Sequence, residues 1–263
     1  PSGRLIRTLK WMPDAKHPFL GTHPHTLTFS PDGTRLASGD IFHSTRVWDV
    51  PSGRELLTIE DGTQGMAWAA NGTEVLLRKG NGETAAWDAA TGKKLRNMER
   101  CGRQFVPVPN RDAFATLSFP MNGHATIELH SNADGSAFRR FPIETHHEFA
   151  SFAFSSDGKR LAAAQKPSKS CMVFDVETAF PILTFGHANA YVASLAFAPD
   201  GTRIATAEED VVSIWDASSG ARLEWFRTGQ SRVPHLTFDP DSSMLFSAGS
   251  DGTVLGWKLA SRK

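Results

Sequence analysis

The feature that most constrains this chain is a pattern that recurs about every 42 residues. It is clearest from Gly186 to Gly220, GHANAYVASLAFAPDGTRIATAEEDVVSIWDASSG, where a Gly-His and a Trp-Asp dipeptide enclose three short apolar segments. Asp-Gly and Glu-Glu-Asp separate these segments, and such residues favour tight turns between antiparallel strands. A repeat of this kind predicts one sheet unit used many times, rather than a series of different domains.

The segments inside this unit have the composition of strands. Val192 to Phe197 and Arg203 to Thr206 alternate apolar with polar or small residues, and Val211 to Ile214 is mostly β-branched. Ser219 and Gly220 then turn the chain into Arg222 to Phe226. The unit is therefore expected to be four antiparallel strands joined by short turns.

The same unit can be followed along the whole chain by the position of its tryptophan. This position recurs about 39 to 45 residues apart, and it is filled successively by Trp48, Trp87, either Leu129 or His130, Phe174, Trp215 and Trp257. The third unit departs most from the pattern. Six sets of the first three strands are expected.

Four residues of the clearest unit, His187, Thr206, Asp210 and Trp215, fall at spacings that resemble the WD40 repeat family. In that family a buried hydrogen-bond chain links a histidine, a turn aspartate, a Ser or Thr and the tryptophan. The resemblance implies that these residues, together with Ser247, Asp251 and Trp257 of the last unit, are structural rather than catalytic. Gln230 stands where the histidine of that last unit would be.

The resemblance implies an all-β fold: a WD40 β-propeller of six four-stranded antiparallel blades in a single domain, 1–263. The blades are expected at about 25–59, 64–98, 103–142, 148–185, 190–226 and 233–260, with 1–9 completing the last one. Pro1 to Leu9 nearly copies Pro51 to Ile59, which follows a third strand. Two solutions remain open: the first strand closes the last blade, or the natural protein continues upstream into a seventh blade.

Composition excludes some classes of function. Lys and Arg total 28 and balance 28 Asp and Glu, so no broad electrostatic attraction to nucleic acid or anionic lipid is expected.

No segment has the length of a membrane span or the pattern of a signal peptide, and we expect a cytoplasmic monomer. Because the chain begins with Pro1, it is also expected to be one module of a longer protein. Cys101 and Cys171 are expected to be reduced thiols.

No motif for catalysis or for a cofactor is present, and we expect neither an enzyme nor a cofactor. His23 and His25 would share one face of a strand, but no third metal ligand is near, so no metal site is expected. The Asp-Gly dipeptides lack the spaced acidic ligands of a calcium loop.

The remaining candidate is a surface. WD40 partners dock on the face formed by the loop between one blade and the next (the D–A loop) and by the loop between the second and third strands (the B–C loop). In this chain that face would carry Trp11, Phe19, Phe42, His43, Arg78, Lys79, Lys166, Lys169, Glu208, Glu209 and Arg232. Exposed aromatic and arginine side chains suit protein binding, although Trp11 and Phe19 could instead pack their own loop down.

We expect a non-catalytic protein–protein interaction platform whose partner is another protein, a peptide or another domain of a longer chain. The alternative is a propeller enzyme or small-ligand receptor that uses the central channel.

Overall fold

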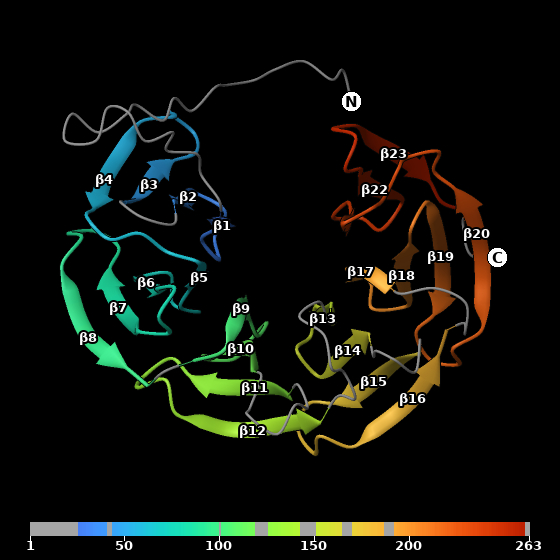
Figure 1. The fold of residues 1–263 in the computed structure, drawn as a ribbon, viewed down its shortest axis with the longest axis horizontal. Helices are drawn as coiled ribbons and strands as arrows, with labels where there is room; N and C mark the ends of the chain where they lie inside the picture. The colour runs from blue at the N-terminus through green and yellow to red at the C-terminus, as the bar shows by residue number, and fades with distance from the viewer. Residues whose placement is uncertain are drawn as a thin grey trace. The chain divides into compact units, whose positions relative to one another are not determined.

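The computed structural model describes residues 26–40, 44–99, 101–118, 126–142, 151–164, 170–186 and 192–260, and within them every regular element is a β-strand (Figure 1). No helix that is long and apolar enough to cross a membrane occurs in this part of the chain. The strands form sheets that we number 1 to 6 in chain order.

Sheets 1 to 3 come from the first half of the sequence. Sheet 1 contains β1 (Thr26–Phe29), β2 (Arg35–Gly39), β3 (Thr45–Asp49) and β4 (Glu55–Ile59). Sheet 2 contains β5 (Gly65–Trp68), β6 (Glu74–Arg78), β7 (Thr84–Asp88) and β8 (Lys94–Met98). Sheet 3 contains β9 (Arg103–Pro107), β10 (Ala113–Ser118), β11 (Thr126–Ser131) and β12 (Ala137–Pro142).

Sheets 4 to 6 follow with the same organisation. Sheet 4 contains β13 (Phe152–Phe154), β14 (Arg160–Ala164), β15 (Cys171–Asp175) and β16 (Pro181–Phe185). Sheet 5 contains β17 (Val192–Phe197), β18 (Arg203–Glu208), β19 (Val211–Asp216) and β20 (Arg222–Arg227). Sheet 6 contains β21 (His235–Phe238), β22 (Met244–Ala248) and β23 (Val254–Lys258).

Within each sheet the strands are adjacent in the order in which they follow one another along the chain. Sheets 1 to 5 have four strands, and sheet 6 has three among the described residues. This confirms the all-β fold of repeated antiparallel units. The strand expected at 1–9, which would complete sheet 6, lies outside the described residues.

The first turn of each unit shows why short strands form here. In sheet 5 the amide of Gly201 donates to the carbonyl of Ala198 at 2.8 Å, and Gly201 has a φ of +69°. Glycine adopts this left-handed conformation at no steric cost, whereas a side chain would oppose it. The Asp200-Gly201 pair therefore places the chain reversal where the sequence predicted it.

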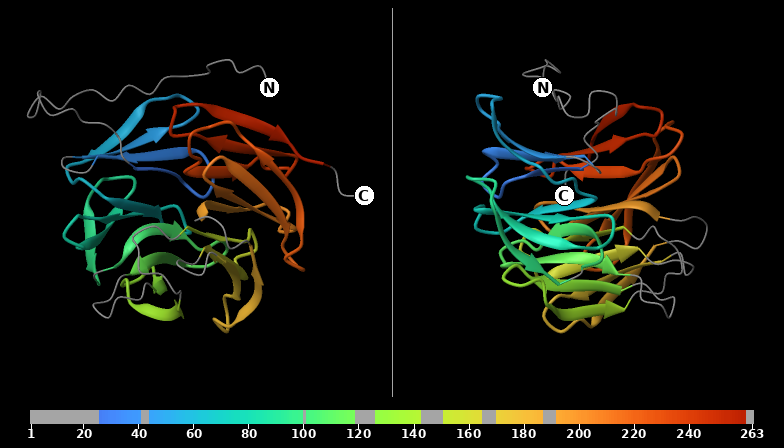
Figure 2. Two further views of the ribbon diagram at one scale, coloured as in Figure 1. Left: turned by 45° about the vertical axis from the view of Figure 1, so that its right-hand side comes forward. Right: turned by 60° about the vertical axis from the view of Figure 1, so that its left-hand side comes forward.

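The chain divides into two compact units, and the division passes through sheet 3. Sheets 1 and 2 belong wholly to the first unit, and sheets 4, 5 and 6 to the second. Within the first unit β1 lies beside β5, and β5 lies beside β9. Within the second unit β17 contacts both β13 and β21. Figure 2 shows the strands from two further directions.

The hydrophobic core of each unit lies between neighbouring sheets. In the first unit, Trp68, Val75 and Leu77 of sheet 2 pack with Val47 of sheet 1. Successive side chains of a strand point to opposite faces of the sheet. The side chains on the other face of sheet 2 are also buried, and they pack against sheet 3. In the second unit sheet 5 is buried on both faces in the same way. These layers hold the turns and loops on which the candidate sites lie.

Candidate functional site

Indole groups near the ends of the third strands donate hydrogen bonds to hydroxyl groups on the second strands. The donor is the indole Nε1–H, and its acceptor is the hydroxyl oxygen of a serine or threonine. The described pairs are Trp48 with Ser38 at 2.7 Å, Trp215 with Thr206 at 2.9 Å and Trp257 with Ser247 at 3.0 Å. Each tryptophan pairs directly with one residue of the second strand, and the hydroxyl residue follows that residue by two positions along the same strand. The repeat thus builds the same polar contact into sheets 1, 5 and 6.

In sheet 6 this contact extends into a longer chain of hydrogen bonds. The hydroxyl of Ser247 donates to Oε1 of Gln230 at 2.7 Å, and Nε2 of Gln230 donates to the hydroxyl of Thr253 at 2.8 Å. That hydroxyl donates in turn to Oδ1 of Asp251 at 2.6 Å. Gln230 is 3% exposed, and its amide can both accept and donate. It therefore links the tryptophan side of the network to the turn aspartate.

Sheet 3 has His130 at the tryptophan position, which resolves the choice between Leu129 and His130. Nε2 of His130 lies 2.9 Å from Oγ1 of Thr116, and Nδ1 lies 2.8 Å from the carbonyl oxygen of Gly135. The ring is 2% exposed and stacks on Phe114. His130 is accordingly held as a structural residue.

Sheets 4 and 2 lack this pair: sheet 4 has neither the donor nor the acceptor, and sheet 2 lacks only the acceptor. In sheet 4 the aromatic residue is Phe174, which has no N–H, and the second-strand position holds Ala163. In sheet 2 the aromatic residue is Trp87, but Leu77 stands at the position of the hydroxyl residue. The Nε1 atom of Trp87 is buried and has no hydrogen-bond partner in the described part of the chain. Sheet 2 therefore keeps the donor of the network without its acceptor.

The expected four-residue set of sheet 5 is described only in part. His187 lies outside the described residues, and its place in the set stays a prediction. The carboxylate of Asp210 accepts hydrogen bonds from the guanidinium of Arg227 at 2.9 and 3.1 Å. Trp215 and Thr206 form the pair given above.

In the second unit, the D–A loop that leads to sheet 6 is joined to the B–C turn of sheet 5 by backbone hydrogen bonds. The amide of Thr228 donates to the carbonyl of Asp210 at 2.8 Å, and that of Val233 donates to Glu209 at 3.0 Å. Glu209 and Arg232 are exposed on these loops, and Glu208 is half-buried. Three of the candidate partner-binding residues are thus brought to the same end of neighbouring sheets.

In the first unit the structure separates two candidates that are adjacent in sequence. Arg78 is expected on an exposed face, but it is 8% exposed, and this part of the expectation is wrong. Its Nε donates to the carbonyl of Cys101 at 3.1 Å, and its Nη1 donates to the carbonyl of Lys79 at 3.0 Å. Burial with these acceptors makes Arg78 a link between sheets 2 and 3. Lys79 is partly exposed and forms an ion pair with Asp61 at 3.0 Å.

The other sequence candidates lie outside the described residues. They are Trp11, Phe19, Phe42, His43, Lys166 and Lys169, and the two histidines considered for metal binding, His23 and His25. Their assignment stays a prediction.

The described residues contain no group of three or more His, Cys, Asp or Glu side chains that could hold a metal ion. Cys101 and Cys171 are free and buried. Burial raises the pKa of Cys101 to about 11 and that of Cys171 to about 12. Both thiols are therefore protonated at neutral pH, when a thiolate would be required for nucleophilic chemistry.

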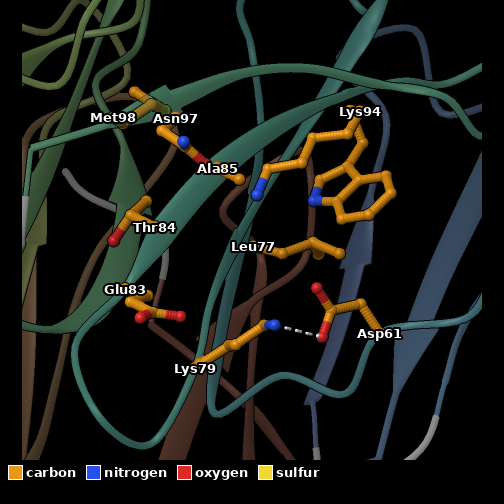
Figure 3. A pocket seen from close by; sticks show the side chains of 10 residues that line it. Asp61, Leu77, Lys79, Glu83, Thr84, Ala85, Lys94, Asn97 and Met98 are labelled. Atoms are coloured by element: carbon orange, nitrogen blue, oxygen red, sulfur yellow. Dashed lines mark ion pairs between the residues drawn. The ribbon is translucent and has the colours of Figure 1, made fainter.

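A cavity of about 440 Å³ lies in sheet 2, beside the unpartnered indole of Trp87 (Figure 3). Its lining is formed by Asp61, Leu77, Lys79, Glu83, Thr84, Ala85, Trp87, Lys94, Asn97 and Met98. Of this set, the sequence predicted only Lys79 as a partner-binding residue, and it placed Trp87 at the tryptophan position of the repeat. A signal was present, because Leu77 precedes Trp87 by the same interval that separates Ser38 from Trp48 and Ser247 from Trp257.

The sequence is similar to known repeat proteins. The family described as "WD domain, G-beta repeat" matches residues 180–216 and 223–258. The chain is 25% identical over 227 residues to WD repeat-containing protein 1 of Mus musculus, a match that covers 80% of this chain and 36% of that protein. It is 23% identical over 219 residues to the B-type cell cycle switch protein ccs52A of Medicago truncatula, with 77% of this chain and 43% of that protein covered. The chain thus spans less than half the length of each of these relatives.

The family matches fall on the last strand of sheet 4, on sheet 5 and on sheet 6. The indole–hydroxyl pairs of sheets 5 and 6 lie inside them. The related pair in sheet 1 extends the same construction beyond the matched residues. Residues 180–258 therefore contain WD40 repeats, and the all-β fold of repeated antiparallel sheets is consistent with a WD40 β-propeller.

Proposed function

We propose that this chain is a non-catalytic platform that binds another protein, a peptide or another domain of a longer chain on the face formed by its D–A and B–C loops. WD40 domains typically bind other proteins, and the family is generally non-catalytic. The chain acts as a monomer in this proposal, and it binds neither nucleic acid nor membranes, in keeping with its balanced charge.

The observation that carries the proposal is the way the loops of the second unit are fixed. Three backbone hydrogen bonds, from Thr228, Val233 and Ser250, join the D–A loop to the turns on either side of it, at 2.8 to 3.0 Å. Exposed Glu209 and Arg232 therefore stand on backbone that is already ordered. A partner that binds them loses less conformational freedom of the loop than one that must order it first.

The chemistry of the described residues also favours binding over catalysis. The described thiols are protonated, and His130 is buried among structural partners. Charged side chains at the loop face, by contrast, suit electrostatic recognition of a partner.

The test is a pair of captures from a lysate of the source organism, read by mass spectrometry. One bait carries Lys79→Ser and Arg232→Ser. The matched control carries Lys93→Ser and Lys159→Ser, which removes the same charge from exposed turns at the opposite ends of the strands. The proposal expects a protein that the wild-type chain and the control retain and that the loop-face variant loses. Equal retention by both variants, or nothing retained by a folded wild-type bait, would contradict it.

A further inference from the structure

The cavity in sheet 2 lies beside Trp87, and the counterpart of this tryptophan in sheet 6 belongs to a hydrogen-bond network. There the amide of Gln230 bonds to Ser247 and Thr253 beside Trp257. By strand register, Leu77 corresponds to Ser247, and Trp87 corresponds to Trp257. Sheet 2 therefore has the indole of the network and a cavity, where sheet 6 has the indole and its acceptors.

One side of this cavity offers hydrogen-bond donors without acceptors. The indole Nε1–H of Trp87 is buried and unpartnered among the described residues. The Lys94 ammonium lies over the same ring, 5.9 Å from its centroid. The structure gives Lys94 no carboxylate partner in the described ranges. Figure 3 shows the Lys94 side chain reaching into the pocket, with the amide of Asn97 nearby. A buried donor without an acceptor is unfavourable. A ligand with an oxygen acceptor would supply the missing partner of the Trp87 indole.

The charges on the other side limit what that acceptor can be. Lys79 is already neutralised by Asp61 at 3.0 Å, and Glu83 lies near this pair (Figure 3). Lys94 is then the one lining cation without a described carboxylate partner. A single negative charge would match it, whereas a dianion such as phosphate would be opposed by Asp61 and Glu83.

The size and the apolar lining point to a small group. A volume of about 440 Å³ lies near the lower end of the range of ligand sites, roughly 300–1,000 Å³. Leu77, Ala85 and Met98 supply apolar surface beside the donors. A carboxylate on a short aliphatic chain has one charge, two acceptor oxygens and an apolar portion that fits this lining.

We propose that the sheet 2 cavity is a carboxylate-binding site, in which Trp87 and Lys94 hold the two oxygens of a short aliphatic carboxylate. The carboxylate belongs either to a free small acid or to an acidic side chain of a peptide. This site does not require the docking role proposed above, because its ligand enters a cavity within one sheet.

The test uses the chain labelled with ¹⁵N at its tryptophan indoles and follows the Trp87 indole resonance, which is assigned by its loss in Trp87→Phe. Sheet 4 shows that phenylalanine can occupy this position. The probes are butyrate, with butyramide as its neutral counterpart, and the peptide acetyl-Gly-Glu-Gly-amide, with its Gln counterpart. The proposal expects a saturable downfield shift with butyrate, with the Glu peptide or with both, and none with the neutral probes. The pattern identifies the source of the carboxylate.

Two variants separate binding at this cavity from a general effect of charge. Lys94→Met should weaken carboxylate binding by about tenfold or more. Lys93→Met should not change it, because Lys93 is also exposed but does not line the cavity. Leu77→Thr supplies the hydroxyl found beside the other indoles and should shift the Trp87 resonance without any ligand. If that variant does not fold, the Lys94 and Lys93 pair still decides the question.

Three results would overturn the proposal. The first is no shift with any carboxylate, which would leave water as the only occupant of the cavity. The second is an equal response to butyrate and butyramide, and the third is equal weakening by Lys94→Met and Lys93→Met.

Discussion

The side-chain amide of Gln230 accepts a hydrogen bond from the hydroxyl of Ser247 at 2.7 Å, and both residues are almost fully buried. The same hydroxyl is the acceptor for Trp257. One glutamine thus completes a polar chain that begins on the third strand of sheet 6 and ends at its B–C turn. Loss of the glutamine amide would leave the buried hydroxyl of Ser247 without this acceptor.

Gln230→Leu should therefore lower the free energy of unfolding by about 1–3 kcal/mol, because leucine fills a similar volume but leaves the hydroxyl of Ser247 without its acceptor. Urea unfolding followed by tryptophan fluorescence measures this. Ser231→Ala, on the exposed neighbouring residue, is the control and should change stability by less than about 0.5 kcal/mol. Equal effects of the two changes would show that the network does not contribute to stability.

The indole–hydroxyl pair of sheet 5 can be measured by a double-mutant cycle. Trp215→Phe removes the donor, and Thr206→Val removes the acceptor with little change in shape. We expect a coupling energy of about 0.5–1.5 kcal/mol, the usual contribution of one hydrogen bond. Trp215→Phe combined with Ser247→Ala, in a different sheet, should be additive within about 0.5 kcal/mol. A coupling near zero for the first pair would contradict the contact.

The strands and turns of this chain were predictable because the determinants are local. Asp200 and Gly201 set the first turn of sheet 5, and alternation in β17 determines which side chains are buried. The sequence could not decide between Leu129 and His130. The contacts of His130 with Thr116 and with the carbonyl of Gly135 decide it, and the sequence alone does not show which side chain makes them.

The candidate site was less predictable because it depends on contacts between sheets. A basic residue at a strand end suggests exposure, but Arg78 reaches the carbonyl of Cys101 on the following segment and is buried by it. The indole of Trp87 has no acceptor because Leu77 stands where other sheets have a hydroxyl residue. Comparison among the repeats reveals that absence, whereas the residue alone looks like ordinary core.

The two cysteines provide a test of burial in both units. Burial raises the pKa of Cys101 to about 11 and that of Cys171 to about 12. At pH 8 neither thiol should react with Ellman's reagent in the folded protein, because the reagent requires an accessible thiolate. Both should react once urea unfolds the chain. A thiol that reacts within minutes in the native state would place that cysteine at an accessible site.

The first turn of sheet 1 should make stability depend on pH through Asp32. Its carboxylate accepts hydrogen bonds from the hydroxyl of Ser30 at 2.5 Å and from the amide and hydroxyl of Thr34 at 3.0 and 2.9 Å. These bonds, that of Ser30 most of all, lower the pKa of Asp32 from 3.8 to about 2.

Since the pKa of Asp32 is lower in the folded state, its carboxylate stabilises the folded protein above the unfolded pKa. This stabilisation is lost as the pH falls from roughly 5 towards 2. Asp32→Asn should therefore be less stable than the wild type at pH 7, and this difference should shrink as the pH approaches 2. Urea midpoints at pH 7, 4 and 2.5 measure the difference, and a gap that stays constant across them would show that the Asp32 charge does not stabilise this turn.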